Sequence, residues 1–155
     1  MSIRSSAKAL IVNDGKILVN KCHHKDGSVY YDLPGGGQRQ YEALEDAVIR
    51  EVMEETGYAA RVVRFAALAE EIHTGAHIRN DYPEYAHRML HIFVVELTAA
   101  GRQESTELDF GMEKSEWLAI DDLKTQKEVY PPALCANLDA VLAGPGAMWL
   151  GTAYK

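Results

Sequence analysis

The sequence has few of the features that mark secreted, membrane-spanning or zinc-binding proteins. Its 155 residues include only two cysteines, Cys22 and Cys135, too few for a disulfide framework or a zinc site. We therefore expect a reducing, cytoplasmic location. The longest uninterrupted apolar run, residues 65–69, is far shorter than the ~20 residues of a membrane-spanning helix. The first six residues also lack the apolar core of a secretory signal, so we expect no membrane partner.

The sequence also has fewer basic than acidic residues. Sixteen lysines and arginines stand against 23 acidic residues, which gives a net charge of −7. This balance argues against binding to a nucleic acid polymer, because such binding needs a basic surface. A small anionic substrate remains compatible with the charge if a metal ion neutralises it locally. Length and average globular composition predict one domain over residues 1–155.

Apolar periodicity predicts strands, then one long helix, then further strands, which is an α+β pattern. A hairpin turns at Asn13-Asp-Gly15, and a helix begins near Tyr41 and ends before Gly57. The predicted strands cover residues 7–12, 16–20, 30–33, 59–72, 87–97 and 117–120, with loops at 73–86 and 99–116 and a last helix over 131–143.

The long predicted helix has carboxylates on its apolar face. At 100° per residue, Glu51 and Glu55 lie within about 20° of Leu44, and Glu54 lies about 80° away. These carboxylates repel one another, and they lie at the helix end where the dipole disfavours anions. A solvated acidic helix end is the alternative, but it would leave an apolar face exposed to water. A hard divalent cation resolves the conflict, because carboxylate oxygens are its preferred ligands.

A glycine turn, Leu33-Pro-Gly-Gly-Gly-Gln38, precedes this helix and lets backbone approach other groups closely. Arg50 stands next to Glu51 and can donate up to five hydrogen bonds, which suits it to hold carboxylates in place. Glu42 is a candidate partner for Arg50, or simply a charge at the helix start.

The spacing of these residues resembles a complete Nudix box. The matching positions are Gly36, Glu42, Arg50-Glu51-Val52, Glu54-Glu55 and Gly57-Tyr58. Only Tyr58 departs from the pattern, which prefers an aliphatic residue there. With the strand at Trp117 and the terminal helix, the chain is similar to small stand-alone MutT-like Nudix hydrolases.

The resemblance implies an α/β/α sandwich around a mixed sheet, with the box as a loop–helix–loop and a C-terminal helix. It also implies Mg²⁺- or Mn²⁺-dependent hydrolysis of a nucleoside diphosphate linked to another moiety. Transferred residue by residue, the resemblance implies that the metal ligands are Glu51, Glu54, Glu55 and the Gly35 carbonyl. It implies that Arg50 orients Glu51, with support from Glu42. Gly36 and Gly57 would be structural residues of the box.

The general base is left open between two places. One candidate is Glu51, and the other is a glutamate of the loop before the tryptophan strand. Of Glu107, Glu113 and Glu116, we rank Glu113 first because it lies in the middle of that loop.

The substrate is the least determined feature. Tyr82 and Tyr85 lie in a predicted loop long enough to bind a ligand, where an aromatic ring could stack on a nucleobase or pack in a plain turn. Residues 59–79 contain neither the proline that is common soon after the box in ADP-ribose enzymes nor the tyrosine that is common there in diadenosine-polyphosphate enzymes. A nucleoside triphosphate is our leading hypothesis. The alternatives are an ADP-ribose or dinucleotide pyrophosphatase, a non-catalytic nucleotide sensor, and an isoprenoid-diphosphate isomerase, for which Cys22 lacks the right context. The sequence leaves a homodimer open.

Overall fold

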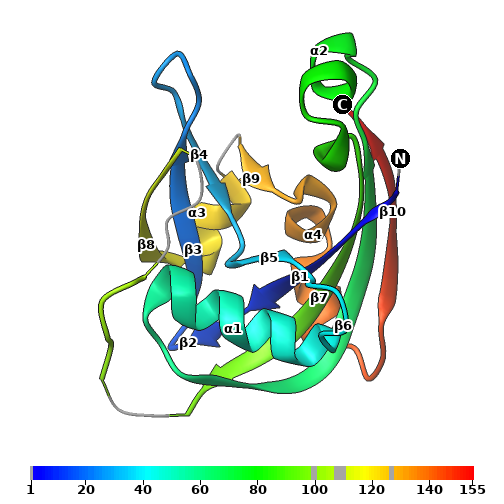
Figure 1. Ribbon diagram of the computed structural model, residues 1–155. Helices are drawn as coiled ribbons and strands as arrows, with labels where there is room; N and C mark the ends of the chain where they lie inside the picture. Colours follow the sequence, from blue (N-terminus) through cyan, green and yellow to red (C-terminus); the bar gives the residue numbers. More distant parts are fainter. Residues whose placement is uncertain (1, 99–100, 107–110, 126–127) are drawn as a thin grey trace.

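The computed structural model describes residues 2–98, 101–106, 111–125 and 128–155, and its strands form two sheets (Figure 1). The first sheet has the order β10-β6-β7-β1-β5, and in the second β3 pairs with β2, β4 and β8, while β9 pairs with β4. The strands of the first sheet are β1 (Arg4–Leu10), β5 (Gly35–Gly37), β6 (Ala60–Ile72), β7 (His87–Leu97) and β10 (Met148–Tyr154). Those of the second are β2 (Val12–Asn13), β3 (Lys16–His23), β4 (Val29–Asp32), β8 (Met112–Ala119) and β9 (Val129–Tyr130).

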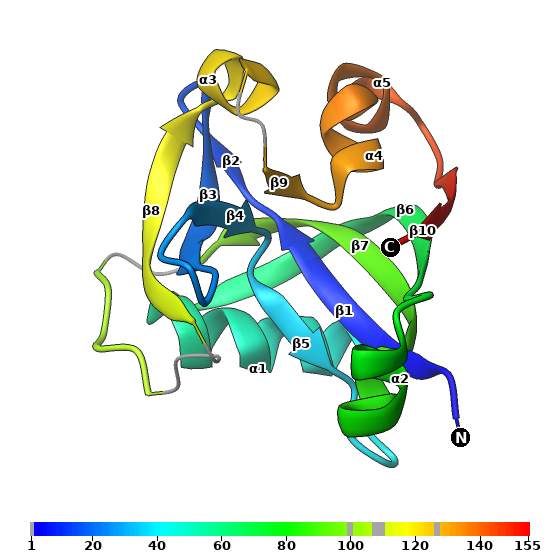
Figure 2. The same ribbon diagram turned by 90° about the horizontal axis from the view of Figure 1, so that it is seen from above.

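Helices lie on both sides of the first sheet (Figure 2). The long helix is α1 (Leu44–Thr56), and the shorter ones are α2 (Ala76–Asp81), η1 (Pro83–Tyr85), α3 (Ile120–Thr125), α4 (Pro132–Ala136) and α5 (Leu138–Ala143). Parallel pairs β1–β7 and β6–β10 occur beside the antiparallel pair β6–β7, so the sheet is mixed. The predicted α+β class is confirmed. Among the described residues, no helix is both long and apolar enough to cross a membrane.

The alternation of β1 separates two hydrophobic cores. Ala7, Ala9 and Ile11 pack on the side of α1, against residues that include Val48, while Leu10 belongs to the core on the other side. Because successive side chains of a strand point to opposite faces, Lys8 lies on the same face as Leu10, between the two sheets. A charged side chain is thereby placed inside the fold.

The boundaries of α1 differ from the prediction at one end. The helix begins at Leu44 rather than Tyr41, because Tyr41 has a φ of 66°, which a right-handed helix cannot contain. It ends as predicted, with Gly57 in the left-handed conformation and its N–H donating to the Met53 carbonyl. The loop geometry at Tyr41 and the cap at Gly57 therefore set the length of the box helix.

The C-terminal part departs furthest from the prediction. The expected single helix over 131–143 is two short helices that meet at Asn137, and β10 follows without having been predicted. The predicted loop over 73–86 contains α2 and η1, which are too short to show a helical period. Similarly, β8 begins at Met112, inside the predicted polar loop, because the consecutive charged residues Glu113 and Lys114 interrupt the alternation that would predict a strand.

Candidate active site

Two glycines of β5 allow close packing, Gly35 against β1 and Gly36 against α1. Gly35 has a φ of 138°, and a Cβ on it would lie 2.1 Å from the carbonyl oxygen of Ala7 in β1. A Cβ on Gly36 would lie 2.5 Å from Oε2 of Glu51. Since only glycine avoids both contacts, the glycine turn lets the Glu51 carboxylate pack directly against backbone.

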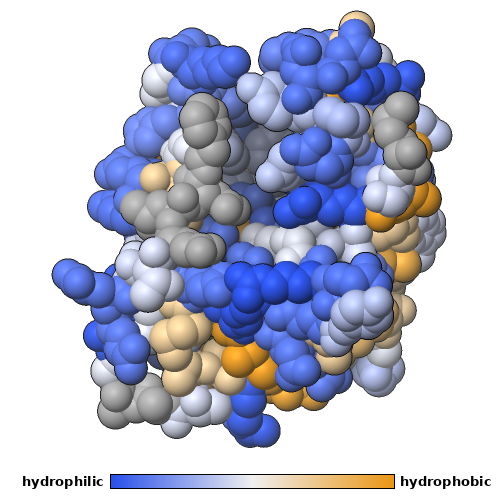
Figure 3. All heavy atoms as spheres, viewed as in Figure 1, coloured by the Kyte–Doolittle hydropathy of each residue, from blue (hydrophilic) through white to orange (hydrophobic). Residues whose placement is uncertain are grey.

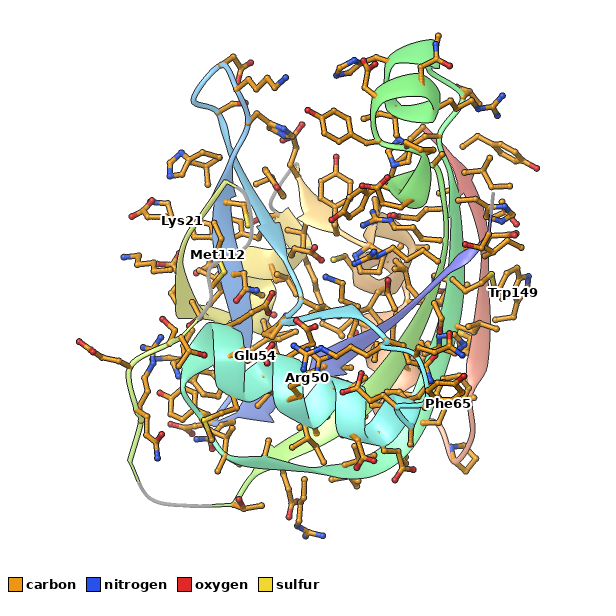
Figure 4. The ribbon with its side chains drawn as sticks, viewed as in Figure 1. Lys21, Arg50, Glu54, Phe65, Met112 and Trp149 are labelled. Carbon is orange, nitrogen blue, oxygen red and sulfur yellow. The ribbon has the colours of Figure 1, made fainter. Side chains whose placement is uncertain are left out.

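Arg50 joins three carboxylates of the predicted box. Its Nε and Nη2 donate to the two oxygens of Glu42, at 2.7 and 2.9 Å. Its Nη1 donates to Glu51 Oε1 at 2.6 Å and to Glu54 Oε2 at 3.0 Å, and its Nη2 also reaches the Gly37 carbonyl at 3.1 Å. Figure 4 shows Arg50 and Glu54 side by side on the same face of α1. One guanidinium therefore orients Glu51 and is itself held by Glu42.

The charges in this network are strongly coupled. The hydrogen bonds from Arg50, with one from the Arg39 backbone N–H, lower the pKa of Glu42 to about 2. In return, the hydrogen bond to Glu42, followed by those to Glu51 and Glu54, raises the pKa of Arg50. Glu42 is therefore ionised and Arg50 charged at neutral pH.

Glu55 lies deeper than the other two glutamates of the helix. Its side chain is buried, and its Oε2 accepts hydrogen bonds from Asn20 Nδ2 in β3 and from the Gly35 N–H in β5, both at 2.8 Å. The carbonyl of the same Gly35 accepts from Lys8 Nζ at 3.0 Å, and Lys8 also donates to Asp32 Oδ2 at 2.9 Å. Burial lowers the pKa of Lys8, but Asp32 and Glu55 outweigh it and raise the pKa.

Asn20, Lys8 and Asp32 were not predicted from the sequence. Their signal was weak but present, since Lys8 interrupts the apolar run 7–12 at a position that alternation turns inward. Asn20 likewise ends the apolar run Ile17-Leu-Val19 while remaining buried. A polar residue in the inward register of a buried strand is the pattern that could have identified Lys8 and Asn20.

The residues predicted as metal ligands have suitable chemistry for Mg²⁺ or Mn²⁺. Glu51, Glu54, Glu55 and the Gly35 carbonyl offer oxygen donors only, which these cations prefer. Gly36 provides the close approach that places Glu51 on the backbone. Within the described part of the chain, no three acidic, histidine or cysteine side chains already form a ready-made metal cluster. Arg50 holds two of the carboxylates instead, and Asn20 with Gly35 holds the third.

Glu113 is not brought together with the box glutamates. Lys21 pairs with Lys114 and Cys22 with Met112, so Glu113 is the extra residue of a β-bulge in β8. Its carboxylate lies 3.0 Å from Lys21 Nζ and 2.6 Å from His23 Nε2, on the face of β3 opposite to Asn20. Figure 4 shows Lys21 well away from Glu54.

The partners of Glu113 also change its acidity. Hydrogen bonds from His23 and then Lys21 lower its pKa to about 2. Of the other two candidates for the loop base, Glu116 lies 3.4 Å from Lys114 Nζ, and Glu107 lies outside the described residues.

Tyr82 and Tyr85 lie at the two ends of the η1 turn. The Arg4 guanidinium stands 4.8 Å above the ring of Tyr85, and His77 meets the ring of Tyr82 edge-on at 5.6 Å. Between them, Glu84 lines a cavity of about 610 Å³ whose other walls are residues 2–5 and 38–42. The two tyrosines therefore stand close to the loop that precedes α1.

Charged and aromatic side chains of the two sheets meet near the C-terminus. Figure 3 shows a hollow above α1 with hydrophilic residues on its rims. On the side of the first sheet, the buried Glu71 pairs with Arg88 and with Lys155, whose Nζ lies 4.2 Å from the centre of the Tyr130 ring. From the second sheet, the rings of Tyr30 and Tyr130 meet edge-to-face at 5.8 Å. Lys155 and Tyr130 thus bring a charged group beside the first sheet into contact with an aromatic ring of the second.

Comparison with known proteins decides the family. The model of the NUDIX domain matches residues 3–135, most of the chain. The chain belongs to the Nudix family. The box predicted from the spacing of its glutamates is therefore part of a Nudix domain, and the recognition made from the sequence is confirmed.

Solved structures agree with this assignment. A NUDIX hydrolase from Nitrosomonas europaea superposes with a TM-score of 0.73 at 19% identity, covering 92% of this chain and 90% of that one. A MutT NUDIX hydrolase from Burkholderia pseudomallei gives 0.61 at 26% identity, with 93% and 99% covered. An ADP-ribose pyrophosphatase from Streptococcus suis gives 0.62 at 21% identity, with 96% and 99% covered. No protein of curated function matches the chain.

Family membership settles the general activity of this Nudix hydrolase. It is an enzyme that hydrolyses pyrophosphate linkages, and Nudix hydrolases act on small nucleotide substrates. Members of the family generally use divalent metal ions.

Proposed function

We propose that this Nudix hydrolase cleaves a pyrophosphate linkage of a nucleoside triphosphate with Mg²⁺ or Mn²⁺. The observation that supports the proposal best is the Arg50 network, in which one guanidinium orients Glu51 and Glu54 against the glycine turn. Oxygen donors from α1 and β5 would hold the metal: Glu51, Glu54, Glu55 and the Gly35 carbonyl. When bound, the metal neutralises charge on the phosphates and acidifies a water molecule.

Glu51 is the proposed general base. It accepts the proton of the attacking water, whose oxygen forms a new bond to one phosphorus while the bridging P–O bond breaks and its electron pair leaves with the other phosphate. Arg50 keeps the carboxylate of Glu51 in one orientation at 2.6 Å. Glu113 is the less favoured base, because its carboxylate is paired with His23 and Lys21 on the far face of β3.

The rest of the substrate would lie in the hollow above α1. Lys8 offers positive charge beside the proposed metal ligands, because its Nζ lies 3.0 Å from the Gly35 carbonyl and is also held by Asp32. Tyr82 and Tyr85 are our candidates for stacking on a nucleobase, because the two residues are 45% and 40% exposed.

A panel of nucleotides tests the proposal. Ribo- and deoxyribonucleoside triphosphates, including oxidised ones, would be incubated with Mg²⁺ or Mn²⁺, and the products identified by mass spectrometry in H₂¹⁸O to locate the attacked phosphorus. We expect turnover that stops with EDTA and is reduced by Glu51→Gln but not by Glu45→Gln, an exposed residue of the same helix. Turnover that persists without metal would refute the metal role.

An ADP-ribose or dinucleotide pyrophosphatase is the second candidate. The Streptococcus suis protein described above is named for such an activity, although that likeness shows the fold alone. ADP-ribose and a dinucleoside polyphosphate therefore belong in the same panel, and a preference for either over every triphosphate would replace the leading proposal. A non-catalytic sensor is not favoured, since every charged position of the box is present.

A further inference from the structure

Asn20 is a buried polar residue in an apolar strand. Its side chain is 4% exposed, and it follows Ile17, Leu18 and Val19 of β3, which are fully buried. Leu18 belongs to the core under α1. Since residues two apart in a strand share a face, Asn20 lies on the same side as Leu18 and meets the C-terminal half of α1 at Glu55.

Two donors from different strands converge on one oxygen of Glu55. The Nδ2 of Asn20 and the N–H of Gly35 each donate to Oε2 at 2.8 Å. Two bonds to one oxygen from two rigid strands fix the rotation of the carboxylate about its last torsion. From this geometry we infer that Asn20 is a positioning residue, which presents Glu55 to the divalent metal in a fixed orientation.

The kind of donor distinguishes Asn20 from Arg50. Arg50 brings a positive charge to Glu51 and Glu54, whereas the amide of Asn20 and the N–H of Gly35 are neutral. These two neutral donors orient the carboxylate without themselves adding a positive charge to it, and the positive charge near Glu55 is that of Lys8. Outer residues that orient metal ligands in this way commonly set the affinity of the site.

A purely structural role explains Asn20 less well. Its Oδ1 is buried and makes no hydrogen bond to any group in the described part of the chain. Burying an unpaired carbonyl oxygen is unfavourable, and a leucine at this position would avoid it while filling similar space. The compensating interaction is on the other side of the amide, where Nδ2 donates to Glu55 Oε2 at 2.8 Å.

The inference rests on the proposed metal-dependent function, and direct metal binding tests it without substrate. Mn²⁺ would be titrated into the full chain and the free ion measured by electron paramagnetic resonance. For Asn20→Leu we expect the Kd for Mn²⁺ to rise about 10- to 100-fold, as is typical when such a partner of a metal ligand is removed. In the activity assay, the Mg²⁺ concentration that gives half the maximal rate should rise by a larger factor than the factor by which kcat falls at saturating Mg²⁺.

Ser115→Ala is the matched control. Ser115 is the cross-strand neighbour of Asn20 in β8, is 5% exposed, and bonds through Oγ to Arg102. Its replacement should leave the Kd for Mn²⁺ unchanged even if it lowers Tm. If Asn20→Leu does not fold by circular dichroism, Asn20→Ala takes its place.

The possible results separate the two proposals. An unchanged Kd in a folded Asn20 variant, with only Tm lowered, would overturn the positioning role and leave the proposed function standing. Wild-type protein that shows no saturable Mn²⁺ binding would overturn the metal site itself, and with it both proposals.

Discussion

Replacing Arg50 by methionine should destabilise the metal-free enzyme and affect the metal-bound enzyme less. The variant keeps the aliphatic stem but removes the cation shared by Glu42, Glu51 and Glu54, whose side chains are only 13–19% exposed. Removing one partner of a fully buried ion pair costs about 3–5 kcal/mol, so this partly exposed network should lose about 2–4 kcal/mol. For a chain of this length that corresponds to a fall in Tm of roughly 5–15 °C.

The metal supplies the second half of this experiment. In saturating Mg²⁺ the ion would take over the neutralisation of Glu51 and Glu54, so the gap between wild type and variant should narrow. Unfolding would be followed by circular dichroism, in EDTA and in Mg²⁺. Arg39→Met is the control, because Arg39 is 60% exposed and touches Glu54 at 3.4 Å, a contact worth about 1 kcal/mol or less. An unchanged Tm for Arg50→Met in EDTA, or an equal loss with and without Mg²⁺, would contradict this account.

Four further substitutions have defined outcomes. Glu51→Gln should lower kcat by about 10²–10⁴-fold, while Glu113→Gln should leave it nearly unchanged; the reverse order in a kinetic assay would make Glu113 the base. The pKa of Glu42 is lowered to about 2 from an ordinary value near 4.5. The ionised Glu42 therefore stabilises the folded protein fully above about pH 4.5, and this contribution is lost as the pH falls to about 2. Denaturant unfolding should therefore show the gap between wild type and Glu42→Gln closing from about pH 5 to pH 2. Tyr41→Gly should raise the free energy of unfolding by up to about 1 kcal/mol in urea, because Tyr41 is 98% exposed at a φ of 66°; a loss would mean that its ring makes a stabilising contact.

The sequence was sufficient for features that depend on neighbours along the chain. The helical period places Glu51, Glu54 and Glu55 on one side of a helix, and the structure has that helix over Leu44–Thr56. The end of the helix was also local, because Gly57 supplies the left-handed residue at that point. The strand over His87–Leu97 was found for the same reason, since its alternation is complete within one segment.

Features that depend on distant partners were missed. Asn20 meets Glu55 across 35 residues and Lys8 meets Asp32 across 24, and no local pattern specifies either pair. Strand β10 pairs in parallel with β6, about half the chain away, and was also not predicted. The predicted place of Glu113 in a loop failed because a bulge in β8 turns its side chain toward Lys21 and His23.

These contacts bear on what metal removal does to the fold. The like-charge repulsion that the sequence predicted among the helix glutamates is already relieved, by the cation of Arg50 at Glu51 and Glu54 and by neutral donors at Glu55. The helix is also anchored by Val48 and Val52 in the core beneath it. We therefore expect EDTA to abolish activity while the far-ultraviolet circular dichroism stays unchanged, with Tm lowered only by the binding energy of the ion. The two spectra would be measured at equal ionic strength, with and without EDTA. An unchanged helical signal is what we expect if the network of Arg50, Asn20 and Gly35 holds the site together without a metal. A loss of helical signal would show instead that the metal is needed to form the site.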